Sequence, residues 1–193
     1  ETQHRSGIMK FLLFLPLFFG VFPDSFVQTD SFSVTFTQVT QNPLFPEIGD
    51  EGTLQVKGCK FRFAYTTNEK RITIGNCREV YQYLEGQSEP LVYQWEELSQ
   101  NPFLQLLINR DVIHTAFVRE KISDDPVVYR LVPKETGKDT PLMVLKITLN
   151  ANETRPEAIE VIDETQQVTT YTFRDFQVDA DLPESLFVRE DTP

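Results

Sequence analysis

The chain has 193 residues and a formal net charge of −11, with an isoelectric point near 4.6. Nucleic acids and anionic membrane surfaces bind proteins through clusters of Lys and Arg, so this charge argues against both as partners. Sixteen Phe, six Tyr and one Trp against eight Gly indicate a Phe-rich core, or such a core with an apolar ligand cavity.

An apolar block directly behind a lysine predicts export. Phe11 to Phe22 follow Met9-Lys10 and read FLLFLPLFFGVF. A basic residue ahead of roughly 7–15 apolar residues is typical of a secretory signal peptide. The block is too short for a transmembrane helix, which needs about 20 apolar residues. We therefore expect an exported protein in three segments: an upstream or added leader over 1–8, a signal peptide over 9–25 and a single domain over 26–193.

Period-2 alternation of apolar and polar residues predicts short β-strands along most of the domain. Phe32, Val34 and Phe36 alternate with Ser33 and Thr35, for example. Similar runs lie at 53–57, 60–65, 71–75, 80–83, 112–118, 127–132, 143–149, 158–162 and 168–173. Turn-forming residues at 48–50, 134–139 and 150–152 separate several of them. Around ten short strands in meander order predict a mainly β fold, with one antiparallel sheet that curls.

The two cysteines, Cys59 and Cys77, are equidistant in sequence from Asn68, the centre of a predicted hairpin. Directly opposed residues of antiparallel strands have Cβ atoms about 4.5–5.5 Å apart, close to the reach of a disulfide. An even cysteine count in an exported chain also favours a disulfide. We expect a Cys59–Cys77 bond, and the alternative is two buried free thiols.

The segment 96–107 breaks the strand pattern and is better read as a helix or two helical turns. Asn101 suits the N-cap and Pro102 the first turn. Phe103, Leu106 and Leu107 then share one face at spacings of three and four residues. Such a helix in a mainly β chain should lie across the sheet and cover it.

Motifs for catalysis or metal binding were not found in the sequence. His4 lies in the leader and His114 in a predicted strand, so no histidine pair has metal-ligand spacing. Gly-rich phosphate loops and Gly-x-Ser-x-Gly are absent as well. The pairs Glu96-Glu97 and Asp124-Asp125 are typical of solvated surfaces. We expect no enzyme activity, no cofactor and no metal; a secreted hydrolase has no positive support.

Several motifs resemble, in the same order, those of the outer-membrane lipoprotein carrier protein LolA family. Ser31 to Gln38 resembles its Phe-x-x-x-Phe-x-Gln opening strand, and Gly52 to Lys57 its Gly-x-Leu-x-Val-Lys strand. The other matching segments are 60–63, Gly75 with 80–83, 101–103 with Leu106-Leu107, 129–133, and Leu182-Pro183 with Phe187. Together the motifs span most of residues 31–190.

The resemblance implies a half-open antiparallel β-barrel whose concave apolar face is covered by short helices. It implies a monomeric periplasmic chaperone that shields the acyl chains of lipoproteins between the inner and outer membranes. The partners would be acylated lipoproteins, the inner-membrane transporter that releases them and an outer-membrane acceptor. The alternative is a periplasmic lipid-binding or envelope-sensor domain of the same fold.

We expect the acyl cavity and its lid to be built from the apolar residues of these motifs and of the later strands. The expected cavity residues are Phe32, Phe36, Phe61, Phe63, Tyr81, Tyr83, Leu131, Tyr171 and Phe173, with Phe103, Leu106 and Leu107 in the lid. Arg62 should point to the opposite face from Phe61 and Phe63. Ordinary core residues would show the same alternation, so both interpretations stay open at this point.

Overall fold

The computed structural model of the chain describes residues 29–98, 101–134 and 144–190. The predicted leader and signal peptide lie outside the described residues, as does most of the predicted turn at 134–139.

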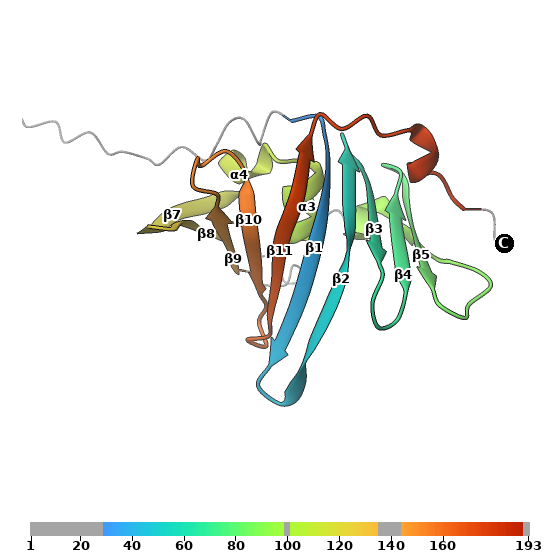
Figure 1. Cartoon of the computed structure of the whole chain (residues 1–193), viewed down its shortest axis with the longest axis horizontal. Coiled ribbons are helices and arrows are strands. Elements are labelled where there is room, and N and C mark those ends of the chain that lie inside the picture. Colours follow the sequence, from blue (N-terminus) through green and yellow to red (C-terminus); the bar gives the residue numbers. More distant parts are fainter. Residues whose placement is uncertain (1–28, 99–100, 135–143, 191–193) are drawn as a thin grey trace, which may run out of the picture.

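Among the described residues, eleven strands form one curled antiparallel sheet that is not closed (Figure 1). Its order is β6-β5-β4-β3-β2-β1-β11-β10-β9-β8-β7, so β6 and β7 are the two edges. The strands are β1 (Ser31–Asn42), β2 (Phe45–Lys57), β3 (Lys60–Tyr65), β4 (Arg71–Gly75), β5 (Glu79–Leu84), β6 (Leu91–Gln94), β7 (Phe117–Asp124), β8 (Val127–Pro133), β9 (Val144–Leu149), β10 (Pro156–Ile162) and β11 (Val168–Val178). The predicted mainly β, half-open architecture is confirmed.

In the described part of the segment between the two edges of the sheet, the chain forms three short helices. They are α2 (Trp95–Leu98), α3 (Pro102–Ile108) and α4 (Val112–Thr115), and a 3₁₀ turn, η1 (Glu184–Phe187), follows β11. Because β6 and β7 lie at opposite edges, the chain between them has to cross the sheet, and it does so over the concave face (Figure 1). The predicted cap is confirmed, since the Asn101 side chain accepts hydrogen bonds from the backbone N–H groups of Phe103 and Leu104 at 2.9 and 3.1 Å.

Two predicted elements are wrong in detail, and one strand, β6, was not predicted. The first hairpin turns at Pro43-Leu44 and not at 48–50, because Gly49 and Asp50 continue the ladder opposite Val39 and Gln38. Residues 112–115, including His114, form α4 and not the start of a strand; short apolar runs do not distinguish the two. Strand β6 follows Pro90 and carries too few residues to show a period.

The core lies between the concave face and the helices. Phe32, Val34 and Phe36 of β1 and their neighbours on the other strands are buried against Leu106 and Leu107. Because alternate residues of a strand point to one face, the same spacing that predicted the strands also supplies this core.

Two phenylalanines of the concave face stand opposite glycines on the next strand. Phe36 pairs with Gly52, and Phe61 pairs with Gly75. A Cβ at Gly75 would overlap the ring of Phe61, and one at Gly52 would lie 2.8 Å from Cζ of Phe36. Glycine at these positions therefore leaves room for each ring to lie across the neighbouring strand.

The C-terminal segment covers the convex face of β3 to β5. Tyr83 Oη accepts a hydrogen bond from the Glu190 backbone N–H at 2.7 Å, and Arg62 forms an ion pair with the Glu190 carboxylate at 2.6 Å. Leu182 and Phe187 are buried in this segment. Arg62 therefore points away from the concave face, as predicted.

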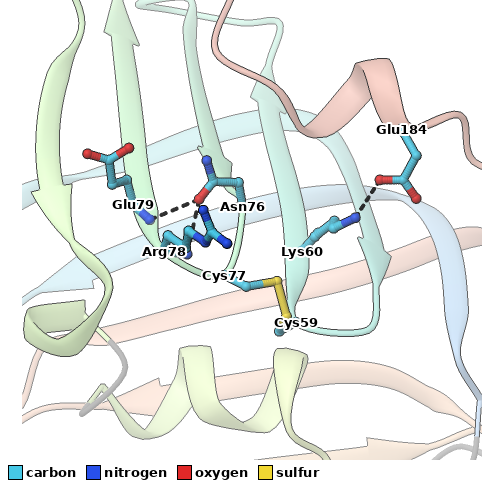
Figure 2. The surroundings of a disulfide bond; sticks show 7 residues. All are labelled: Cys59, Lys60, Asn76, Cys77, Arg78, Glu79 and Glu184. Atoms are coloured by element: carbon cyan, nitrogen blue, oxygen red, sulfur yellow. Dashed lines mark hydrogen bonds and ion pairs between the residues drawn. A yellow bond between two sulfur atoms is a disulfide. The ribbon is translucent and has the colours of Figure 1, made fainter.

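The predicted disulfide is confirmed. Cys59 and Cys77 are bonded with their Cα atoms 5.5 Å apart, and the bond joins the turn before β3 to the turn after β4 (Figure 2). The second turn is further ordered by Asn76, whose side-chain oxygen accepts from the backbone N–H groups of Arg78 and Glu79. Lys60 pairs with Glu184 beside the first turn, which links this end of the hairpin to η1.

Candidate functional site

A cleft of about 200 Å³ opens on the concave face between strands β3 to β5 and helix α3. It is lined by Phe61, Phe63, Tyr65, Arg71, Thr73, Val80, Gln82, Phe103, Leu104 and Tyr171. Two other hollows, of about 190 and 270 Å³, are lined mainly by polar and charged residues. Of these three hollows on the described part of the chain, the cleft under α3 has the most apolar lining and is the one that suits an apolar ligand.

The strand register explains which side chains face the cleft. Phe63 is paired with Thr73, and Thr73 with Gln82. Directly opposed residues of antiparallel strands point to the same face. Phe61, Gly75 and Val80 form the next row along the strands by the same rule.

Aromatic rings form the floor and one wall of the cleft. The Phe36 ring contacts those of Phe63, Tyr65 and Tyr171, with centroid separations of 5.6, 5.2 and 6.0 Å. Phe103 of α3 stacks on Tyr171 with centroids 4.7 Å apart. Helix α3 thus contacts the aromatic wall of the cleft through Phe103.

The two ends of α3 have different surroundings. Phe103 and Leu104 in the first turn are only partly buried and line the cleft. Leu106 and Leu107 are 0% and 2% exposed and belong to the core. The second half of the helix is therefore an anchor, while the first half covers the opening.

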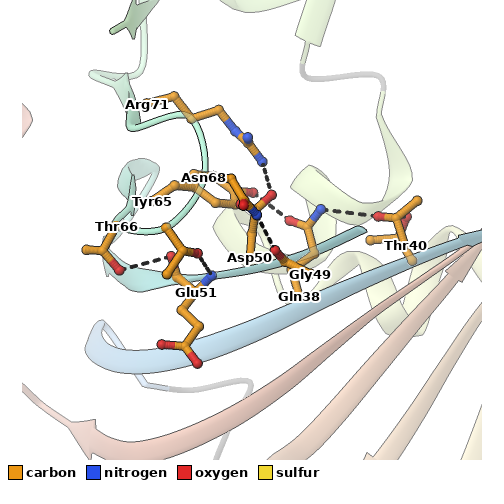
Figure 3. A network of polar contacts seen from close by, with 11 residues as sticks. Gln38, Thr40, Gly49, Asp50, Glu51, Tyr65, Thr66, Asn68 and Arg71 are labelled. Atoms are coloured by element: carbon orange, nitrogen blue, oxygen red, sulfur yellow. Dashed lines mark hydrogen bonds and ion pairs between the residues drawn. The ribbon is translucent and has the colours of Figure 1, made fainter. Parts of the chain in front are cut away.

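One residue of the cleft lining, Arg71, forms an ion pair with Asp50 (Figure 3). The Arg71 guanidinium lies over the Tyr65 ring, 3.6 Å from its centroid, and donates to the Asp50 carboxylate at 3.2 Å. The Asp50 side chain is 5% exposed and also accepts from the Asn68 amide at 3.1 Å. Arg71 is therefore held in a fixed orientation by an ion pair on one side and an aromatic ring on another.

Two phenol groups accompany the charged pair. Tyr65 Oη donates to the Gln38 side-chain oxygen at 2.9 Å. Burial raises the pKa of Tyr65, although Arg71 opposes this, and burial raises the pKa of Tyr171 further. Both phenols therefore stay protonated and neutral at any physiological pH.

The structure divides the predicted cavity residues into groups. Phe61, Phe63 and Tyr171 line the cleft, with Phe103 above them, and Phe36 lies beneath. Phe32, Leu131 and Phe173 lie in the buried core outside the cleft lining, as do the predicted lid residues Leu106 and Leu107.

Tyr81 and Tyr83 do not face the cavity. Tyr81 is paired with Ile74 and Tyr83 with Ile72, the rows that alternate with the cleft-facing rows. Both tyrosines therefore lie on the convex face, where Tyr83 bonds Glu190 and Arg189 lies 5.9 Å from the Tyr81 ring centroid. The prediction for these two tyrosines was wrong because it rested on their aromatic character alone. The strand pairing, which decides the face on which each side chain lies, puts them on the convex face.

Six cleft residues were missed: Tyr65, Arg71, Thr73, Val80, Gln82 and Leu104. A signal for most of them was present. The hairpin centred on Asn68 pairs Phe63 with Thr73, and extending that register places Arg71 opposite Tyr65. In β5, Gln82 is paired with Thr73 and Val80 with Gly75, so both lie on the same face as Phe63.

Two absences concern the described residues alone. Within 29–98, 101–134 and 144–190, His, Cys, Asp and Glu side chains form no group of three or more that could hold a metal ion. No helix in that part of the chain is long and apolar enough to cross a membrane.

The decisive comparison concerns the family. The model of the family described as outer membrane lipoprotein carrier protein LolA matches residues 27–190. The chain belongs to the LolA family. A search of curated proteins gave no significant match.

Solved structures show that the LolA fold is retained at very low identity. A LolA superfamily protein from Nitrosomonas europaea is 16% identical, with a TM-score of 0.51 over 88% of this chain and 98% of that chain. An uncharacterized conserved protein from Thermus thermophilus is 13% identical, with a TM-score of 0.51 over 86% and 90%. A DUF1329 family protein from Desulfovibrio piger is 10% identical, with a TM-score of 0.50 over 86% and 92%. These likenesses establish the fold alone.

Proposed function

We propose that this chain is a periplasmic carrier that binds the acyl chains of lipoproteins in the cleft under α3 and carries them from the inner to the outer membrane. The observation that supports the proposal most directly is an apolar, aromatic-lined cleft on the concave face of a LolA-family sheet. The partners would be acylated lipoproteins, the inner-membrane transporter that releases them and an outer-membrane acceptor. Binding and release need no covalent chemistry.

The energetics suit a cargo that has to be released again. Burial of an acyl chain gains about 0.8 kcal/mol for each CH₂ group. The cleft, at about 200 Å³, is smaller than the roughly 300–1,000 Å³ typical of small-molecule sites. Loading therefore requires the first turn of α3 to move outward. Breaking the Phe103–Tyr171 stack costs only about 0.5–1.5 kcal/mol beyond the loss of buried area.

A release assay tests the proposal directly. Inner membranes that carry a triacylated lipoprotein and its releasing transporter are incubated with the purified chain. We expect the lipoprotein to appear in the soluble fraction in a complex with the chain. Mass spectrometry of an organic extract of the purified protein should in addition detect acyl lipids. Binding of free lipid without any lipoprotein would contradict the carrier role and favour a lipid-binding or envelope-sensor domain.

Phe103→Asp should weaken acyl binding about tenfold, because a carboxylate placed in an apolar cleft loses hydration without gaining a partner. Displacement of a fluorescent acyl probe measures the affinity, and thermal unfolding checks the fold. Val118→Asp is the matched control, since Val118 is 56% exposed on β7, at the edge of the sheet. Unchanged binding by the Phe103 variant would remove α3 from the mechanism.

A further inference from the structure

The charged pair in the cleft needs an explanation beyond stability. Only 26% of the Arg71 side chain and 5% of the Asp50 side chain are exposed, so both groups have lost much of their hydration. Buried ion pairs often stabilise a fold no better than apolar residues of similar size. An ion pair at the wall of an apolar cleft therefore indicates a second role for these side chains, such as contact with a polar part of the ligand.

Arg71 is positioned to donate hydrogen bonds into the cleft. Its side chain is part of the cleft lining, and its guanidinium is supported by the Tyr65 ring at 3.6 Å. A guanidinium carries five N–H donors in a fixed plane, so the contact with Asp50 leaves it able to donate to a ligand oxygen. Asn68 holds the carboxylate in turn (Figure 3), which fixes the plane of the guanidinium before a ligand arrives.

The charge balance restricts the kind of oxygen that suits this position. Asp50 already neutralises Arg71, so the pair has no net charge to attract an anion. A carboxylate or phosphate that reached Arg71 would approach the Asp50 carboxylate as well, and in a partly desolvated site that repulsion is strong. A neutral carbonyl oxygen accepts the same hydrogen bond without adding a charge.

We propose that Arg71 and Asp50 form a subsite for the neutral carbonyl oxygen of an acyl ester or amide, and that the pair selects such ligands over free fatty acids. The acyl chain then lies along Phe61, Phe63 and Phe103, with its carbonyl carbon at the Tyr65 end of the cleft. The inference rests on the proposed function, because it assigns one part of the same ligand. It also explains how a carrier in a compartment with free fatty acids would keep its cleft for esterified or amidated chains.

Three probes with the same 16-carbon chain test the subsite in the full-length chain: 1-palmitoylglycerol, 1-O-hexadecylglycerol and palmitate. The ether lacks only the carbonyl oxygen, and palmitate replaces the ester with a carboxylate. The native protein should bind the ester about tenfold more tightly than either competitor. Equal binding of ester and ether would overturn the subsite while leaving the carrier proposal intact; no binding of any probe would contradict both.

Two variants separate the roles of the pair. Asp50→Asn leaves the guanidinium without its counter-charge, so affinity for palmitate should rise about tenfold. The double variant Asp50→Asn with Arg71→Met removes both charges and the donors while keeping a similar volume, so ester and ether should bind equally. Thermal unfolding confirms that each variant is folded. Failure of Asp50→Asn to increase palmitate affinity would refute the charge argument, and the probe comparison in the native protein does not depend on either variant.

Discussion

Gly52→Ala is expected to lower the free energy of unfolding by about 3 kcal/mol, at the upper end of the range for overpacked sites. The new Cβ would overlap the backbone carbonyl oxygen of Ala64 on β3 and lie 2.8 Å from Cζ of Phe36. A side chain could rotate away from such a contact, but a carbonyl in a hydrogen-bonded ladder cannot. Relief therefore requires β2 and β3 to move apart. Urea unfolding measures the loss.

Gly49→Ala is the control on the same strand. A Cβ at Gly49 meets nothing closer than the Gln38 carbonyl oxygen at 3.9 Å, which is an ordinary contact. Its free energy of unfolding should stay within about 0.5 kcal/mol of the native value. If both variants lost the same free energy of unfolding, the steric argument would be contradicted. The effect of each alanine would then come from the reduced backbone flexibility that any replacement of glycine causes.

The Gly52 variant should also affect ligand binding. The Phe36 ring, which Gly52 accommodates, contacts Phe63, Tyr65 and Tyr171 around the cleft. Displacing that ring changes the floor on which an acyl chain would rest. We therefore expect Gly52 to influence ligand binding through Phe36, although it does not line the cleft.

Removing the disulfide by the double substitution Cys59→Ser and Cys77→Ser should cost about 3 kcal/mol. The bond spans a sequence separation of 18 residues, and closing a loop of about that length restricts the unfolded chain by an amount of this order. For a domain of this size the loss corresponds to a fall in Tm of about 6–12 °C. Differential scanning calorimetry of both proteins measures it.

Reductant provides the control for the disulfide. Dithiothreitol should lower the Tm of the native protein toward that of the double variant and leave the variant unchanged. If the reductant is shown to have broken the disulfide and the Tm of the native protein does not change, the prediction is contradicted. Destabilisation of the double variant in reductant would indicate an effect unrelated to the bond.

Much of the fold was predictable because its determinants are local. Alternation in Phe32, Val34 and Phe36 specifies one strand without reference to any other, and Asn101 caps α3 within two or three residues of itself. The disulfide followed from the symmetry of one hairpin about Asn68. Each of these features depends on residues close together in sequence.

The cleft was harder to predict because both faces of β3 to β5 are covered. Helix α3 lies over one face and the C-terminal segment over the other, so residues of both parities are buried. Tyr81 is 7% exposed on the convex face and Phe63 is 8% exposed on the concave face. The residues on the two faces of the sheet are thus alike in burial and aromatic character. Only the strand register tells which face a given residue occupies.

The charged pair was not predictable by local pattern. Arg71 and Asp50 come from strands β4 and β2, with β3 between them. Nothing in the sequence near either residue indicates the other. Their meeting depends on how the end of the β3–β4 hairpin lies against β2, which the Asn68 contacts to Gly49 and Asp50 show.

The unjoined edges β6 and β7 have a mechanical consequence. The described sheet is a curved strip and not a tube, so its radius is not fixed by strand number and shear as in a closed barrel. Small changes in the twist between several pairs of strands can flatten the sheet and widen its concave side. The hydrogen bonds between the strands stay intact during such a change. Elastic bending spread over the described strands would then add to the outward movement of α3 in making room for a bulky guest.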